Sequence, residues 1–553
     1  MKKIITIFYI IFSYYSSLLA QNNEKPKLVV GIVIDQMRYD YLSRYSEKFG
    51  DGGFRRLLKQ GFNCKNAHYN YAPTETAPGH ASVYTGATPA SHGIVGNYWF
   101  ENDKTVYCVT DTNVELLGAL AGEGAASPRN LLMHTFGDEL KIATMGKSKV
   151  FGVSLKDRGA VLPAGHAGNA AYWFDGVSGN FVTSTYYMDK IPTYIEKFNQ
   201  KKLSDKFLKD TWKTLYPIEK YTESTIDNTN FEQKLGNGKD TPTFPYVMPD
   251  IIEKAKKNQF KKPVYELLRF TPFGNTLVKE MALTILTEEK LGKNNQTDVL
   301  AISFSATDLA GHAYGAQSIE VQDMYLRLDR ELEEILENLD KEVGEDSYVV
   351  FLTADHAGSY APNFLKSMKI PSGFFDFKAE SQVFKMRLET KFGKGDWVAK
   401  FDDQNIYFNK ELILQNKLEL EDFEKLAIEH YRKIDGVFDV FSVNELVEEG
   451  AKTAAQQMWL NGYYHKRSGD VLIALKPNWL DKGWYEKGGS NHGSTYNHDT
   501  HVPILFYGWK IPKGKSTSRR INITDIAPTI TNILNIQKPN GSSGEPILEI
   551  LGE

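Results

Sequence analysis

The stretch Lys27-Leu-Val-Val-Gly-Ile-Val-Ile34, followed by Asp35, decides the fold class of this 553-residue chain. It is a near-continuous run of apolar and β-branched residues, which is typical of a strand covered on both faces of a parallel sheet. Open α/β sheets bind their ligands at the carboxyl ends of such strands. Asp35 therefore stands where a ligand is expected, although an Asp at a strand end is more often a turn residue or a helix cap.

Three later segments repeat this pattern of a buried strand that runs into charged side chains. Strands are predicted at 149–153, 298–304 and 347–352, and the residues that follow them are Lys156 and Arg158, Asp308 and His312, and Asp355 and His356. Asp308 and His312 are four residues apart, so one helical turn puts both on one face, as metal ligands often are. Asp355 and His356 are adjacent and point in different directions, which suits two neighbouring metals better than one. We therefore expect an α/β fold with a central, mostly parallel sheet.

The length of the chain exceeds that of one ordinary domain, but large α/β enzymes reach this size through insertions into one sheet. The segment 160–296 carries polar tracts with aromatic residues between them, and we predict a cap or insertion near the active site there. Further along, we predict a strand at 405–408, a helix at 419–434 and a strand at 470–475. The formal net charge of −4 provides no basic excess, so we expect no nucleic-acid-binding surface.

The segment Met1–Ala20 has the pattern of a secretory signal peptide: two lysines, an apolar run and small residues before a cleavage point near Ala20. Residues 21–553 would then form the mature catalytic domain. No later stretch is apolar for about 18 residues, so we predict no membrane span and expect a periplasmic or secreted monomer. Cys64 and Cys108 can pair in an oxidising compartment, and two buried free thiols are the alternative.

The stretch Asn70-Tyr-Ala-Pro-Thr-Glu-Thr-Ala-Pro-Gly-His80 predicts a helix that begins near Thr76, with Pro78 in its first turn. Backbone N–H groups and the helix dipole favour an anion there, so a phosphate or sulfate can lie over the Thr76 hydroxyl. The alternatives are that Thr76 is only a helix cap, or that Thr74 is the nucleophile. Asn97, in a loop rich in Gly and Pro, offers a neutral donor.

Three histidines, His492, His498 and His501, fall within ten residues, although the chain has only 12. Such clustering indicates ligands, of which one or two are needed. The candidate metal ligands are three carboxylates and three imidazoles, a set that suits two Zn²⁺ ions: Asp35, Asp308, His312, Asp355, His356 and His492. Two such ions can activate Thr76 as a nucleophile that forms a phospho-threonine. The charge of the phosphoryl oxygens would be neutralised by three further donors, Asn97, Lys156 and Arg158.

The order of these motifs along the chain resembles that of the alkaline phosphatase superfamily. Within the superfamily, the chain most resembles the PafA-type bacterial phosphate monoesterases. The motifs extend over nearly the whole mature chain: Asp35, Pro73-Thr-Glu-Thr-Ala-Pro-Gly-His80, Asp308-x-x-x-His312, Asp355-His356 and His492-Gly-Ser. The resemblance implies an alkaline-phosphatase-like α/β/α sandwich, a di-zinc site and a covalent phospho-threonine intermediate. It implies no Mg²⁺ site, because a lysine occupies that place in these enzymes.

The resemblance also implies a role for each candidate residue. It would put one ion, the one that activates Thr76, on Asp35, Asp355 and His356, and the other on Asp308, His312 and His492. It favours His492 over the other two clustered histidines through the His-Gly-Ser motif, and Thr76 over Thr74. The phosphoryl contacts it implies are Asn97, Lys156 and Arg158.

The predicted function is an exported alkaline phosphatase that hydrolyses small-molecule phosphate monoesters. A phosphodiesterase or nucleotide pyrophosphatase of the same superfamily would share Thr76 and the metal ligands, but the cations Lys156 and Arg158 favour a dianionic monoester. A sulfatase is disfavoured because it needs a modified Cys or Ser at this position. A non-catalytic metal-binding protein is a third alternative, disfavoured because incompletely ligated metals leave positions open for substrate.

Overall fold

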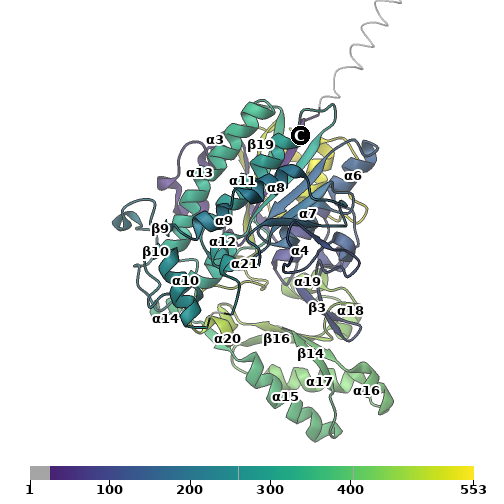
Figure 1. Ribbon diagram of the computed structural model, residues 1–553. Helices are drawn as coiled ribbons and strands as arrows, with labels where there is room; N and C mark the ends of the chain where they lie inside the picture. Colours follow the sequence, from purple (N-terminus) through teal and green to yellow (C-terminus); the bar gives the residue numbers. More distant parts are fainter. Residues whose placement is uncertain (1–24, 260, 403, 553) are drawn as a thin grey trace, which may run out of the picture.

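One large sheet forms the centre of the computed structural model, which describes residues 25–259, 261–402 and 404–552 (Figure 1). The predicted signal peptide lies outside these residues. The 11 strands follow one another across the sheet in this order, with β21 (Ile521–Asn522) beside β2: β20 (Lys515–Thr517), β2 (Phe62–His68), β19 (His501–Gly508), β12 (Tyr348–Thr353), β1 (Leu28–Ile34), β11 (Asp298–Phe304), β6 (Val150–Ser154), β7 (Ala170–Phe174), β8 (Phe181–Ser184) and β5 (Leu116–Leu117).

The predicted buried strands are the inner strands of this sheet. β1 pairs in parallel with β11 on one side and with β12 on the other, and β11 pairs in parallel with β6. Every residue of these four strands is buried, which explains their near-continuous apolar sequences. β19 runs antiparallel to both β12 and β2. The prediction of a mostly parallel α/β sheet is confirmed.

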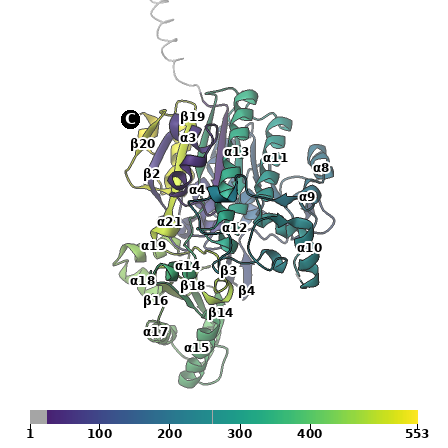
Figure 2. The same cartoon turned by 90° about the vertical axis from the view of Figure 1, so that its left-hand side faces the viewer.

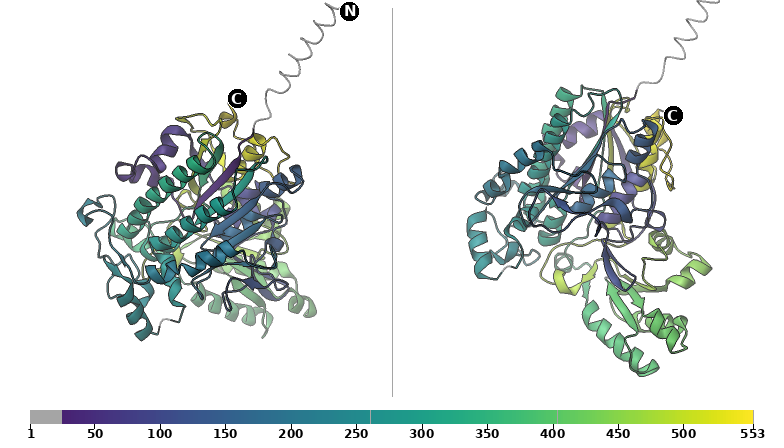
Figure 3. Two further views of the ribbon diagram at one scale, coloured as in Figure 1. Left: turned by 45° about the horizontal axis from the view of Figure 1, so that its top comes forward. Right: turned by 45° about the vertical axis from the view of Figure 1, so that its right-hand side comes forward.

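Helices cover both faces of the sheet (Figures 1 and 3). One group of contacting helices consists of α3 (Phe54–Gln60), α11 (Pro272–Glu288) and α13 (Ile319–Glu342), and the other of α4 (Thr76–Thr85), α6 (Phe136–Ala143), α7 (Asp157–Ala164) and α22 (Ile526–Ile533). The Ser318 side chain caps α13, which buries one apolar stripe along its length. Short helices at other places are α2 (Tyr41–Arg44), α5 (Pro89–His92), α14 (Pro362–Ser367), α20 (Lys482–Tyr485), α21 (Asn497–Thr500) and α23 (Leu548–Leu551).

The cap predicted at 160–296 is not a single insertion, because both ends of that segment belong to the main body. β7 and β8 extend the central sheet, and α11 packs against β11. The strands are only five and four residues long and rich in aromatic residues, so their sequences resemble those of a loosely patterned cap. Between them and α11, the described residues form three α-helices, short 3₁₀ helices and a two-stranded sheet. The α-helices and strands are α8 (Thr193–Gln200), α9 (Leu203–Phe207), α10 (Met248–Lys257), β9 (Thr211–Trp212) and β10 (Tyr246–Val247).

A second unit, residues 373–481, lies beyond one end of the sheet (Figures 1 and 2). It has its own antiparallel sheet in the order β14-β15-β17-β16 and its own hydrophobic core. The elements predicted at 405–408, 419–434 and 470–475 are β15, α17 and β17, but the sequence did not mark this unit as separate. Its elements are β13 (Gly373–Phe375), α15 (Phe377–Phe392), β14 (Val398–Asp402), β15 (Asn405–Phe408), α16 (Lys410–Gln415), α17 (Leu420–Tyr431), β16 (Val437–Ser442), α18 (Val443–Glu449), α19 (Ala454–Gly462), β17 (Val471–Leu475) and β18 (Trp479–Asp481).

The two cysteines do not form a disulfide in this structure; both are free and buried, and they belong to different hydrophobic clusters. Burial raises the pKa of the Cys64 thiol to about 12 and raises that of Cys108 as well. Since the thiolate is the reactive form, we expect no reaction of the native protein with an aromatic disulfide reagent and two titrated thiols after denaturation. A denatured, unreduced sample that shows no thiol would contradict this prediction. Among the described residues, no helix combines the length and the apolar character needed to cross a bilayer.

Candidate active site

The predicted site residues meet at the carboxyl ends of the inner strands, as parallel pairing requires. Asp35 directly follows β1, and Asp355 and His356 follow β12. Asp308 and His312 lie on α12 (Ala306–Tyr314), which begins two residues after β11. β6 is followed by Lys156, which precedes the first residue of α7, and Thr76 is the first residue of α4. The side chains come from positions between 35 and 356 of the chain, yet they share one edge of the sheet.

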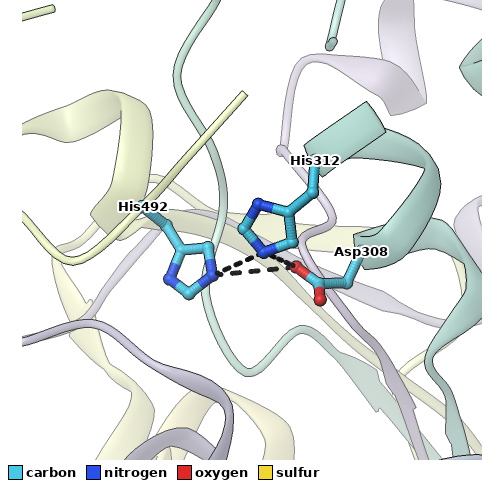
Figure 4. Close-up of side chains that lie close together, drawn as sticks. All are labelled: Asp308, His312 and His492. Carbon is cyan, nitrogen blue, oxygen red and sulfur yellow. Dashed lines mark hydrogen bonds and ion pairs between the residues drawn. The ribbon is translucent and has the colours of Figure 1, made fainter. Parts of the chain in front are cut away.

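Asp308, His312 and His492 form the first group that can hold a metal ion (Figure 4). The Nε2 atom of His312 is 3.1 Å from Asp308 Oδ1, and the Nε2 atom of His492 is 3.7 Å from the same oxygen. The two Nε2 atoms are 3.3 Å apart. Of the three clustered histidines, only His492 lies in this group. His498 lines the cavity beside the group without joining it, and His501 stacks on the ring of His68.

Backbone carbonyls fix the orientation of all three histidines of the site. The Nδ1 atom of His312 is 2.9 Å from the Ser490 carbonyl, that of His356 is 2.9 Å from the Ala357 carbonyl, and that of His492 is 2.7 Å from the Thr74 carbonyl. A carbonyl only accepts, so each Nδ1 carries a proton, and the neutral form of each ring presents its lone pair on Nε2. This arrangement is typical of metal-ligating histidines.

Asp35, Asp308 and His356 form a second such group, so Asp308 belongs to both. Asp355 lies beside it, with Oδ1 at 3.8 Å from His356 Nε2. Within the part of the chain that the structure describes, three buried atoms here make no hydrogen bond: Asp35 Oδ1, Asp355 Oδ2 and His356 Nε2. Buried acceptors without a donor are costly, and a cation would satisfy all three. The residues therefore fit a pair of metal ions.

The pKa values of Asp35 and Asp355 also indicate that a cation is needed here. Asp308 differs: despite its burial, the charges of His312 and Lys156 hold its pKa well below the ordinary value. Burial, together with the charges of Asp308 and Asp355, raises the pKa of Asp35 well above its ordinary value. Burial raises the pKa of Asp355 to about 7. Carboxylates this close together and this deeply buried need positive charge to stay ionised at neutral pH.

Lys156 supplies part of that positive charge. Its Nζ atom is 2.7 Å from Asp35 Oδ2, 2.6 Å from Asp308 Oδ2 and 3.2 Å from the Thr76 hydroxyl oxygen. Sequence reasoning expected Lys156 to bind phosphoryl oxygens; in the structure its contacts are two candidate ligands and the candidate nucleophile. Lys156 therefore joins the metal groups to Thr76.

Thr76 is held at the start of α4 by its neighbours. The N-cap residue is Glu75, so Thr76 is the first helical residue and not the cap. Burial lowers the pKa of His80 to about 3, and the neutral ring places Nδ1 2.8 Å from the Thr76 carbonyl and Nε2 2.9 Å from the Ser303 hydroxyl. The Thr74 hydroxyl donates to the Ser494 carbonyl and accepts from the Gly493 N–H. It is committed to that loop, whereas the Thr76 hydroxyl faces Lys156.

Asn97 and Arg158 stand at the mouth of the site. Asn97, just before β3 (Tyr98–Glu101), accepts from the Ala77 N–H through Oδ1, which leaves its amide NH₂ group for another acceptor. That N–H is therefore not free for an anion, contrary to the prediction from the helix start. Arg158 Nη1 donates to the hydroxyl of Tyr107, the last residue of β4 (Lys104–Tyr107). Both residues line a cavity of about 520 Å³, together with His312 and His492.

Residues of the 373–481 unit form the far wall of this cavity, among them Gln404, Tyr407 and Trp479. Sequence reasoning did not place this unit at the site, and it did not single out His80, Tyr107 or Gln36. His80 stood within the quoted motif, but nothing local distinguished it from a core histidine. Tyr107 carried no signal in the sequence, because its role depends on a partner 51 residues away.

Comparisons with known proteins agree with this geometry. The model of the type I phosphodiesterase / nucleotide pyrophosphatase family matches residues 29–500. The chain belongs to this family. It is 43% identical over 533 residues to "Alkaline phosphatase PafA" of Elizabethkingia meningoseptica, covering 96% of this chain and 95% of the relative. It is 42% identical over 544 residues to a Myroides odoratus protein named "Calcium-transporting ATPase", covering 98% and 97%.

A solved structure of wild-type PafA matches this family member with a TM-score of 0.90 and 42% sequence identity, covering 96% of this chain and 100% of that one. The predicted superfamily, its PafA-type branch and the α/β/α fold are confirmed. The enzyme class predicted from the sequence, alkaline phosphatase, agrees with the PafA relative over nearly the full length of both chains.

Proposed function

We propose that this protein is an exported alkaline phosphatase that hydrolyses small-molecule phosphate monoesters with Thr76 as nucleophile and two divalent cations, expected to be zinc. One observation carries the proposal: the Thr76 hydroxyl lies 3.2 Å from Lys156 Nζ, and the same ammonium group bonds Asp35 and Asp308. The nucleophile is therefore adjacent to both groups of candidate ligands. Asp35, Asp355 and His356 would hold one ion, and Asp308, His312 and His492 the other.

Two ions bound there would polarise the phosphoryl oxygens and favour the ionised form of the Thr76 hydroxyl. The residues of the chain supply the rest of the reaction. Thr76 Oγ1 attacks phosphorus and the ester oxygen leaves, which gives a phospho-threonine that water then hydrolyses. The Asn97 amide and the Arg158 guanidinium bind equatorial oxygens, where negative charge is spread in the transition state. Lys156 offsets the charge of the carboxylates around the nucleophile.

The family includes phosphodiesterases, so the charge of the phosphoryl group decides whether the substrate is a monoester or a diester. A monoester dianion has one more charged oxygen than a diester. Arg158 is half-buried, and its buried Nε atom makes no hydrogen bond within the residues that the structure describes. That donor favours the monoester. The cavity of about 520 Å³ beside the site favours a diester instead, since it has room for a second substituent on the phosphate. A phosphodiesterase is therefore the second candidate.

Arg158→Ala tests the choice between the two esters. We expect it to lower kcat/KM for an aryl phosphate monoester by about 10²–10³-fold and to affect the matching methyl aryl diester much less, because the lost donor serves the extra charged oxygen. The measurement is kcat/KM for both esters in the wild type, in Arg158→Ala and in the control Arg129→Ala, an exposed arginine that bonds Asp111.

Lys156→Ala/Arg158→Ala extends this series, but the single variant is the cleaner test because Lys156 also bonds Asp35 and Asp308. A wild-type preference for the diester, or an equal loss on both esters in Arg158→Ala, would assign the protein to the diesterases.

A further inference from the structure

Gln36 directly follows Asp35 and has an unusual backbone conformation. Its φ is 62°, in the left-handed region, within a turn closed by a bond from the Met37 N–H to the Ile34 carbonyl. This conformation is unfavourable for a residue other than glycine, and Gly or Asn usually takes such a turn position. Backbone strain of this kind is often stored at functional sites, which points to a role for this glutamine other than local stability.

Those contacts join two candidate metal ligands from different parts of the chain. The Gln36 backbone N–H donates to Asp355 Oδ1 at 3.3 Å, and its side-chain Nε2 donates to Asp308 Oδ1 at 2.8 Å. Asp355 follows β12 and Asp308 lies on the helix after β11. Gln36 is only 5% exposed, so both bonds lie away from solvent.

Two glycines make room for the Gln36 side chain. A Cβ atom on Gly311 of α12 would lie 1.8 Å from Gln36 Oε1, and one on Gly358 would lie 2.9 Å from its Cγ and Cδ atoms. Neither distance is possible, so the side chain fits only because both positions lack a Cβ. The amide is therefore packed against Gly311 and Gly358, where it also reaches Asp308.

We propose that Gln36 is a positioning residue that fixes the carboxylates of Asp308 and Asp355 relative to each other, and thereby sets the spacing of the two cations. This inference rests on the part of the proposed function that concerns the two bound cations. It does not depend on which reaction the protein catalyses. Asp308 Oδ1, which accepts from Gln36, is the same oxygen that faces His312 and His492. Hydrogen bonds of this kind orient ligands and strengthen metal binding.

The test compares two variants with a control that shares the backbone strain. Gln36→Met keeps the length of the side chain and loses its hydrogen bond, whereas Gln36→Gly also relieves the left-handed φ. Lys417→Gly relieves the same strain, at φ 58°, at an exposed position in the 373–481 unit. Zn²⁺ stoichiometry and affinity are measured on the full chain by competition with a chromophoric chelator, and thermal unfolding is measured on the metal-free protein.

We expect both Gln36 variants to bind at least one ion about 10–100-fold more weakly, with kcat reduced more than KM is raised. Metal-free Gln36→Gly should unfold at the same temperature as the wild type or higher, and Lys417→Gly should keep wild-type affinity. Wild-type affinity for two ions in the Gln36 variants would overturn the inference, as would a wild type that binds fewer than two.

A purely structural role would change unfolding of the metal-free protein and leave affinity unchanged, which also overturns the inference. If the wild type binds two ions but hydrolyses no phosphate ester, the proposed function fails while the affinity data still decide the role of Gln36.

Discussion

Thr76→Ala should lower kcat/KM for an aryl phosphate monoester by about three to six orders of magnitude, because it removes the attacking oxygen. Thr76→Ser, which keeps a hydroxyl, should retain far more activity. Neither variant removes a candidate metal ligand, so the ion content of both should equal that of the wild type. The measurements are steady-state kinetics and metal analysis of the same samples.

Thr74→Ala is the matched control, since Thr74 lies two residues away and its hydroxyl bonds the loop at Ser494 and Gly493. We expect a much smaller loss of activity from it. Acid quenching of the wild type during turnover of a labelled monoester should trap the label on the peptide that contains Thr76. A label on Thr74, or a Thr76→Ala variant that keeps most of its activity, would show that the nucleophile is assigned to the wrong residue.

Removal of the metal ions should have the second largest effect. We expect a chelator to lower activity by about 10³-fold or more, since the ions stabilise the transition state by several kcal/mol. Zn²⁺ should restore activity and Mg²⁺ alone should not. The chelated protein should also unfold at a lower temperature. An ion whose free concentration is 100 times its Kd stabilises the folded state by about 2.7 kcal/mol. Activity and thermal unfolding are followed on one chelated sample before and after each ion is added.

His492→Ala separates the two ions. It should lower the bound metal by about one ion per chain, because His492 belongs to the group with Asp308 and His312 and, among the described residues, to no other group. His501→Ala, from the same histidine cluster, is the control: its ring stacks on Tyr39 and His68, so its removal should leave the metal content unchanged. Equal metal loss in both variants, or restoration of the chelated protein by Mg²⁺ alone, would argue against this assignment.

The sequence by itself determined those features that depend on neighbours within about ten residues. The apolar run of β1 predicted a strand buried on both faces, and the Asp at its end predicted a ligand position. The spacing of Asp308 and His312 predicted two side chains on one helical face, and both lie on α12. These inferences hold because strand and helix periodicities fix which side chains share a face.

Other features depend on contacts between distant parts of the chain, which no local pattern encodes. Spacing alone did not distinguish His492 from His498 and His501, and the family motif favoured His492. The tertiary structure showed that the His492 ring is the one that approaches Asp308. Only the structure showed that Lys156 bonds the carboxylates, and that Gln36 reaches Asp308 across 272 residues of sequence. Strand order across the sheet decides these contacts, because it brings the ends of β1, β6, β11 and β12 together. That order arises from burial of surface between elements that the chain brings together only on folding.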